Sequence, residues 1–141
     1  MTNSRQHVGY LIKVIDDKLQ KKADMDLKQH DLTMMQSRVL AFLAGKGGHA
    51  TQKEVEVFLE VAHPTVVGII SRMERADFLI SYPDREDKRN KIVELTAKSH
   101  RIGQEIERTI NTQEKKLLAG MSAEQVAELE RLLNIIYKNL D

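Results

Sequence analysis

Two neighbouring groups of side chains carry the chemistry that this sequence offers. One is a polar and cationic set within residues 64–75, and the other is the charged segment 84–91, which holds four cations and three anions. Arginine and lysine side chains bind phosphate, and arginine also pairs with the edges of guanine bases. The available chemistry is therefore recognition of a polyanion such as duplex DNA. On charge alone, segment 84–91 fits a solvated surface turn equally well.

The candidate contacts in the first group differ in kind. Arg72 and Thr65 are the polar side chains best placed for the floor of a major groove or for its phosphate walls. Gly68 permits close approach of the backbone, and Val67 can touch a thymine methyl group. A different interpretation of Arg72 is a surface arginine paired with a nearby carboxylate, at Glu54 or Glu74.

Two hydrophobic periods define the elements that must position these groups. Helical spacing of apolar residues predicts a helix with one buried face, formed by Val66, Ile69, Ile70 and Met73. Pro64 suits the first turn, so the helix is expected to begin at residue 63 or 64. The period then falls to two, which predicts a β-hairpin with its tip at residues 84–91. Its apolar positions are Phe78, Ile80, Tyr82, Ile92, Val93 and Leu95.

The preceding sequence predicts three further helices. An amphipathic pattern covers residues 4–27, and capping boxes at Thr33-x-x-Gln36 and Thr51-x-x-Glu54 open the next two helices. The second of these short helices is expected to turn Val55, Phe58 and Leu59 inward. Three or four residues then lead to the helix at Pro64, which is the connection of a helix-turn-helix.

The glycine-rich residues 45–48 admit two interpretations. A Walker-type phosphate loop follows a strand and ends in Gly-Lys-Ser/Thr, whereas this segment follows a helix and lacks that ending. A helix C-cap followed by a loop fits the sequence better.

Both ends of the chain carry long apolar stripes. Thr96 is expected to cap a helix that runs to about residue 119, and Ser122-x-x-Gln125 is a capping box for a last helix. That last helix holds more apolar residues than one small globule can cover, and residues 8–19 carry a matching stripe. A symmetric dimer built from both chain ends would bury these faces. The alternative is a monomer whose ends fold back over its own core.

Composition excludes several classes of mechanism. The 141 residues include no cysteine, which removes disulfides, thiolate metal sites and thiol redox sensing. The five histidines lack the spacing of a metal site, although a site assembled from distant helices stays open, and no hydrolase, kinase or dinucleotide motif occurs. We therefore expect no enzyme, no catalytic residue, no metal and no cofactor. No apolar run is long enough for a membrane span and no secretory signal is evident, so we expect a cytoplasmic protein.

The sequence resembles the MarR (multiple-antibiotic-resistance regulator) family of winged-helix transcription factors over almost its whole length. Residues 65–74 look like the recognition helix of the family, and residues 84–96 look like its wing. Residues 118–124 are similar to the break before its last helix. The sequence departs from the family pattern at four positions. Gly68 replaces a longer polar residue, Ser99 replaces a glycine, and Glu86 replaces an arginine. Asp77 replaces the glycine usual after the recognition helix, so a left-handed turn is expected there, which Asp is one of the few residues to tolerate.

The resemblance implies a dimer with interlocked terminal helices that binds a pseudo-palindromic operator in double-stranded DNA. Family members are mostly repressors released by small aromatic or phenolic ligands. The wing match implies that Asp87 braces Arg89, that Arg89 enters the minor groove, and that Lys88 and Arg85 face phosphates. The expected DNA-contacting residues are therefore Pro64, Thr65, Val67, Gly68, Ser71, Arg72, Arg75, Arg85, Asp87, Lys88 and Arg89.

Together these observations predict a mainly α-helical protein with a small antiparallel β wing. Residues 31–96 are expected to form a winged helix-turn-helix DNA-binding domain, and residues 1–30 and 97–141 a helical dimerisation region. The expected function is that of a homodimeric transcriptional repressor relieved by a small aromatic or phenolic effector. The alternative is a winged-helix module that binds protein and not DNA. No effector-binding residue is assigned, because the residues near the helix junction, Tyr10, His30, Met34 and Met35, fit a core equally well.

Overall fold

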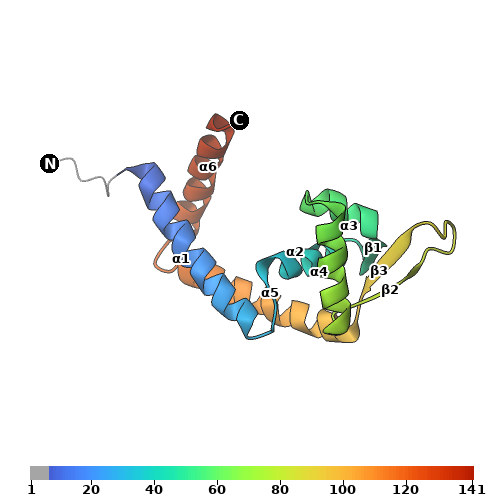
Figure 1. Ribbon diagram of the computed structural model, residues 1–141. Coiled ribbons are helices and arrows are strands. Elements are labelled where there is room, and N and C mark those ends of the chain that lie inside the picture. Colours follow the sequence, from blue (N-terminus) through green and yellow to red (C-terminus); the bar gives the residue numbers. More distant parts are fainter. Residues whose placement is uncertain (1–6) are drawn as a thin grey trace. The chain divides into compact units, whose positions relative to one another are not determined.

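The computed structural model describes residues 7–141 and is mainly helical with one small antiparallel sheet, as predicted. In chain order the elements are α1 (Val8–Lys28), α2 (Met34–Gly45), β1 (His49–Thr51), α3 (Gln52–Leu59), α4 (His63–Arg75), β2 (Leu79–Pro83), β3 (Lys91–Leu95), α5 (Ala97–Leu117) and α6 (Ala123–Asn139) (Figure 1). The start expected for α1 at residue 4 lies outside the described residues. The chain forms two compact units, Met1–Gln104 and Glu105–Asp141.

The sheet has three strands in the order β1-β3-β2, so the prediction of a two-stranded wing was incomplete. β1 pairs antiparallel with β3, with Ala50 opposite Val93. Three residues are too few to show an alternating pattern, and this strand exists because β3 offers it a partner. The β2–β3 hairpin continues past the rest of the sheet and extends away from α3 and α4 (Figure 1).

Buried and exposed residues alternate in the hairpin as expected, but Ile80 and Tyr82 are not among the buried ones. Leu79 is buried and pairs with buried Leu95, while Ile80 and Tyr82 are exposed. Phe78 is buried as well, but it precedes the strand and belongs to the turn after α4. The strand alternation therefore starts at Leu79, one residue later than the sequence pattern suggests.

The core of the first unit lies between α2, α3, α4 and the sheet. All four apolar residues predicted for α4 are buried. Other elements of this unit also contribute to the core, through Val39, Leu43, Val55, Phe78 and Val93, each at most 1% exposed. Phe58 does not join them, contrary to the prediction. It is 38% exposed and stacks on Phe42 with ring centroids 4.5 Å apart, and the guanidinium of Arg38 lies 5.4 Å from the centre of the Phe58 ring.

Two of the three predicted capping boxes are complete. Thr33 with Gln36, and Ser122 with Gln125, exchange both hydrogen bonds of the motif. At Thr51 only one of the two hydrogen bonds of the motif is present, the one in which Thr51 Oγ1 accepts from the Glu54 backbone N–H. The Glu54 carboxylate accepts from the Thr51 hydroxyl and not from the Thr51 backbone N–H. Thr51 ends β1, where its backbone pairs with Ile92 in β3, which explains the different arrangement.

Residues 45–48 form a helix C-cap and loop. Gly47 and Gly48 adopt positive φ angles of 79° and 102°, and the Gly48 N–H donates to the Leu43 carbonyl at 2.8 Å. This ends α2 and turns the chain into β1.

Apolar side chains lie exposed on both terminal elements, each considered by itself. On α1, Val8, Leu11, Ile12, Ile15 and Leu19 are exposed, and in the described structure no residue of α6 is buried. Just beyond α6, Leu140 is 82% exposed. None of the helices described is both long enough and apolar enough to cross a membrane.

Candidate nucleic-acid interface

The first component of the site is the exposed face of α4. The chain enters this helix through Ala62 in an extended conformation, and Pro64 lies in the first turn, where a missing N–H is not needed. The predicted contact residues of α4 are exposed except half-buried Gly68, and all lie on the side opposite the buried face. They are Pro64, Thr65, Val67, Gly68, Ser71, Arg72 and Arg75. This face carries two cations and no carboxylate, which suits a helix that enters a groove lined by phosphates.

Arg72 does not form the ion pair that its alternative interpretation required. Glu74 contacts the Ser81 hydroxyl and lies 3.5 Å from Lys91 Nζ, and Glu54 lies 3.7 Å from Lys46 Nζ. Within the described residues, the guanidinium of Arg72 has no carboxylate partner and lies instead over Gly68. Its N–H groups are available to a ligand.

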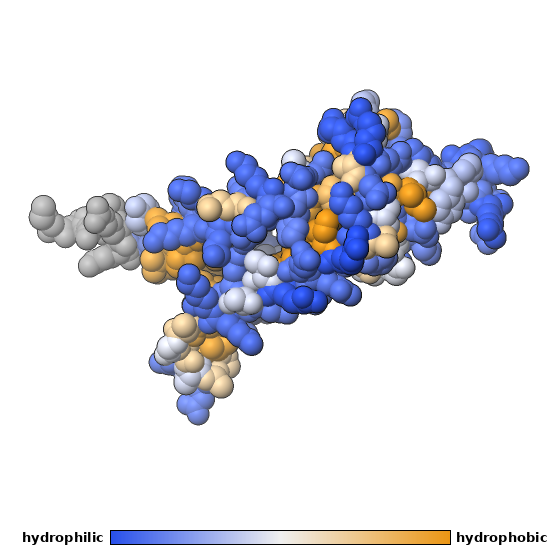
Figure 2. Space-filling view, turned by 90° about the horizontal axis from the view of Figure 1, so that it is seen from below, coloured by the Kyte–Doolittle hydropathy of each residue, from blue (hydrophilic) through white to orange (hydrophobic). Residues whose placement is uncertain are grey.

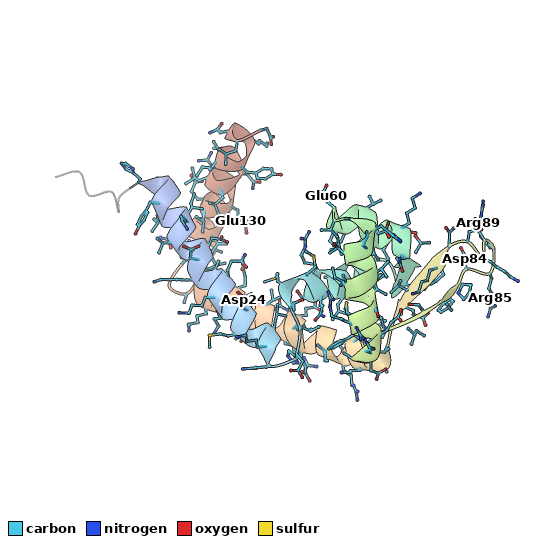
Figure 3. The ribbon with its side chains drawn as sticks, in the orientation of Figure 1. Asp24, Glu60, Asp84, Arg85, Arg89 and Glu130 are labelled. Atoms are coloured by element: carbon cyan, nitrogen blue, oxygen red, sulfur yellow. The ribbon has the colours of Figure 1, made fainter. Side chains whose placement is uncertain are left out.

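The second component is the tip of the β2–β3 hairpin. The Asp84 N–H donates to the Asn90 carbonyl at 2.9 Å and closes the loop, and Asp84 Oδ1 accepts from the Glu86 N–H. Figure 3 shows Arg85 and Arg89 at this far end, with side chains directed into solvent. On the face seen in Figure 2, the outer end of the wing is hydrophilic.

Asp87 and Arg89 form the brace that the family resemblance implies. Arg89 Nε and Nη2 donate to the two carboxylate oxygens of Asp87, both at 2.9 Å, and the Arg89 backbone N–H donates to Oδ1. These bonds, the side-chain pair first, hold the pKa of Asp87 below its ordinary value, and the fork raises the pKa of Arg89. The pair therefore stays charged at neutral pH. Because the fork uses one edge of the guanidinium, the other edge of Arg89, whose side chain is 89% exposed, points outward.

The structure brings the two components together in one unit. α4 and the wing belong to the same compact body, and α4 packs against β2. Arg85 and Lys88 are exposed on the same tip as Arg89. The geometry thus offers a helix for one groove and a braced arginine for the next.

Comparison with known proteins identifies the family. Residues 30–90 match the profile of the MarR family. A curated relative, the uncharacterized HTH-type transcriptional regulator YwoH of Bacillus subtilis (strain 168), is 30% identical over 135 residues, which cover 96% of this chain and 97% of the relative. The chain belongs to the MarR family.

Solved structures agree with this assignment. MepR, a transcription regulator of the Staphylococcus aureus multidrug efflux pump MepA, superposes with a TM-score of 0.84 at 25% identity, over 96% of this chain and 99% of that chain. A MepR mutant bound to an oligodeoxyribonucleotide superposes with a TM-score of 0.73 at 26% identity, over 96% of this chain and 99% of that chain. Both likenesses confirm the winged-helix fold in this MarR-family protein.

A third component, which sequence reasoning did not assign, is the junction between the end of α4 and the start of α5. Three successive backbone carbonyls accept hydrogen bonds there. Lys98 Nζ donates to Ala76 O at 2.7 Å, Thr96 Oγ1 to Asp77 O at 2.7 Å, and buried Ser99 Oγ to Phe78 O. The ammonium of Lys98 also lies 4.3 Å from the centre of the Phe78 ring. In this MarR-family chain, Thr96 and the first turn of α5 therefore fix where α4 ends and where the chain enters β2.

The sequence contained part of this junction. Thr96 was expected to cap the next helix, and it does so by accepting from the Ser99 N–H at 3.2 Å. The sequence pattern marks Ser99 only as a replaced glycine, and no motif in it indicates a role for Lys98. The Lys98 ammonium donates to a backbone carbonyl 22 residues earlier in the chain. Because every residue has a backbone carbonyl, the sequence does not show which one Lys98 binds.

Asp77 occupies the left-handed conformation expected for it, with φ 65°. Because this region is costly for a β-branched residue and tolerated by Asp or Asn, Asp77→Val should lower the unfolding free energy by about 1–2 kcal/mol or more. Asp77→Asn should leave it nearly unchanged. Thermal denaturation of both variants by circular dichroism checks this, and equal melting temperatures for the two would show that the turn is not under this constraint.

Proposed function

We propose that this MarR-family protein is a homodimeric transcriptional repressor that binds a pseudo-palindromic operator in double-stranded DNA. The observation that carries the proposal is the pairing of a carboxylate-free, cationic face on α4 with an arginine braced by Asp87 at the tip of the same unit. Likeness to a MepR mutant bound to an oligodeoxyribonucleotide supports it.

Each contact has a proposed role. Arg72 and Thr65 read the major groove, with Val67 against a thymine methyl group, and Arg89 enters the adjacent minor groove. Phosphates are contacted by Ser71, Arg75, Arg85 and Lys88, and Pro64 lies in the first turn of α4 at the helix entry. The proposed DNA-binding domain is 31–96, and residues 1–30 and 97–141 form the dimerisation region.

The test of DNA binding begins with selection of a preferred duplex from a random pool by the purified full chain. Fluorescence anisotropy then gives the affinity for that duplex and for a scrambled duplex of equal length. We expect at least a thousandfold preference, the lower end for specific regulators. Equal, weak affinity for both duplexes, or none, would instead favour a winged-helix module that binds protein.

The dimer is supported by the exposed apolar faces of α1 and α6. Two copies of a surface of this kind bury each other when related by a twofold axis. Sedimentation equilibrium at micromolar concentration should give about twice the 16.1 kDa mass of one chain. A mass of one chain would contradict the proposal, and removal of residues 126–141 should leave a product that aggregates or does not fold.

Relief of repression by a small aromatic or phenolic effector is proposed from family membership. The expected result is that such a compound lowers operator affinity without unfolding the protein. Screening phenolic compounds in the anisotropy assay, with circular dichroism as the control for folding, tests it. An operator complex that no such compound releases would argue for a different effector class.

A further inference from the structure

Gly68 interrupts the exposed face of α4 at a place where the backbone does not require glycine. Gly47, Gly48 and Gly120 are the glycines with positive φ in the described chain, and Gly68 is not among them. It lies in the middle of a continuous helix, where glycine is less favourable than alanine. The feature to explain is therefore the missing side chain and not a special conformation.

The space beside Gly68 is filled by Arg72. A Cβ at position 68 would lie 3.4 Å from Arg72 Nη1, 3.8 Å from Nη2 and 3.9 Å from Cζ. Side chains on a helix lean toward its N-terminus and cover the residue four positions earlier, which brings this guanidinium onto position 68. Neither of the nearby carboxylates draws the guanidinium away, because Glu74 pairs with Lys91 and Glu54 with Lys46.

We infer that Gly68 is a positioning residue that sets the sequence preference of Arg72, by leaving the space in which the guanidinium lies flat along α4. The inference rests on the proposed function. A long side chain at position 68 would occupy this space and push the guanidinium outward or toward the C-terminal end of the helix. One helical turn is about 5.4 Å, which exceeds the roughly 3.4 Å between successive base pairs. Arg72 would then meet a different base, or none.

The size of the side chain at position 68 separates this role from a direct contact between the Gly68 backbone and DNA. At 3.4 Å a methyl group makes ordinary contact with the guanidinium, so Gly68→Ala leaves Arg72 in place. If instead the Gly68 backbone itself had to touch DNA, alanine would already weaken binding. Gly68→Gln gives a similar gain in helix propensity but fills the space.

The experiment measures affinities for the selected operator and for its single-base variants, using the full chain and the substitutions Gly68→Ala, Gly68→Gln and Arg72→Ala. Gly68→Ala should raise the melting temperature and lower the operator preference much less than Gly68→Gln does. Gly68→Gln should also raise the melting temperature, yet lower the preference at one base position at least tenfold, to the level of Arg72→Ala. In the Arg72→Ala background, Gly68→Gln should cause no further loss of preference.

Three outcomes would overturn the inference. Equal losses with alanine and glutamine at position 68 would show that the backbone is the contact. Additive losses of preference from Gly68→Gln and Arg72→Ala would show that Gly68 does not act through Arg72. An unchanged operator preference in Gly68→Gln would show the same. In each of these cases the unchanged protein still binds its operator and the proposed function stands. Failure of the unchanged protein to bind any duplex overturns the proposed function, and this inference with it.

Discussion

Arg72→Ala is expected to weaken operator binding by about 1–3 kcal/mol for each half-site and to alter the preferred base at one position. The reason is that Arg72 is exposed on the face of α4 opposite the core, without a carboxylate partner in the described chain. A smaller, uniform loss across all sequences, with a shallower salt dependence, would assign Arg72 to a phosphate and not to a base.

Arg131→Ala provides the matched control for charge. Arg131 is an exposed arginine of α6 whose guanidinium pairs with Glu128, so this change removes one cation outside the proposed interface. It should leave operator affinity within about twofold of the unchanged protein, since isolated exposed charges act weakly at physiological salt. Equal losses of operator affinity from Arg72→Ala and Arg131→Ala would show that Arg72 contributes only through the net charge of the protein.

The second large effect is expected at the wing. Arg89→Ala should weaken binding most on operators whose flanking minor groove is narrow and A·T-rich, because such grooves concentrate negative potential. Replacing the flanking A·T pairs with G·C should therefore remove most of the difference between Arg89→Ala and the unchanged protein. A loss that is independent of the flanking sequence would place Arg89 on a phosphate.

The substitution Asp87→Asn distinguishes two effects of Asp87 on DNA binding: its hydrogen bonds to Arg89 and its negative charge. Removing an anion near DNA favours binding by simple electrostatics, whereas loss of the fork frees Arg89 to move and disfavours its ordered insertion. If the brace at 2.9 Å matters, Asp87→Asn should weaken binding to A·T-flanked operators despite the favourable change in charge. Tighter binding would mean that Asp87 only repels DNA.

The features predicted correctly from sequence depend on residues close together in the chain. The reciprocal caps at Thr33 and Ser122 join residues three positions apart, and the buried face of α4 follows from its helical period. The left-handed turn at Asp77 follows similarly, because few residue types adopt that conformation. Local rules fix such features, and tertiary packing then preserves them.

The features that sequence reasoning missed depend on distant partners. β1 is three residues long and exists through pairing with β3 some 40 residues later. The helical pattern predicts that Phe58 faces the core, whereas in the structure Phe58 is exposed and stacks on the ring of Phe42. The carbonyl contacts of the α4–α5 junction likewise join residues about 20 positions apart. No local pattern encodes such pairings.

The junction also suggests how the DNA-binding elements are held in place. Ala76, Asp77 and Phe78 lie between α4 and β2, and their three carbonyls accept hydrogen bonds from Thr96 and from the first turn of α5. A displacement of that turn would therefore move α4 and β2 together. The geometry of α4 relative to the wing therefore depends on Lys98 and Ser99 as well.

Salt dependence of operator binding tests the central claim most directly. For a dimer that neutralises about eight phosphates, log K should fall with log salt concentration at a slope near −7, and removal of one phosphate contact per protomer, as in Lys88→Ala, should reduce the slope by about 2. The measurement is a series of anisotropy titrations between about 50 and 200 mM salt. Binding that is absent at the lowest salt, or a slope near zero that Lys88→Ala does not change, would contradict DNA recognition by α4 and the wing.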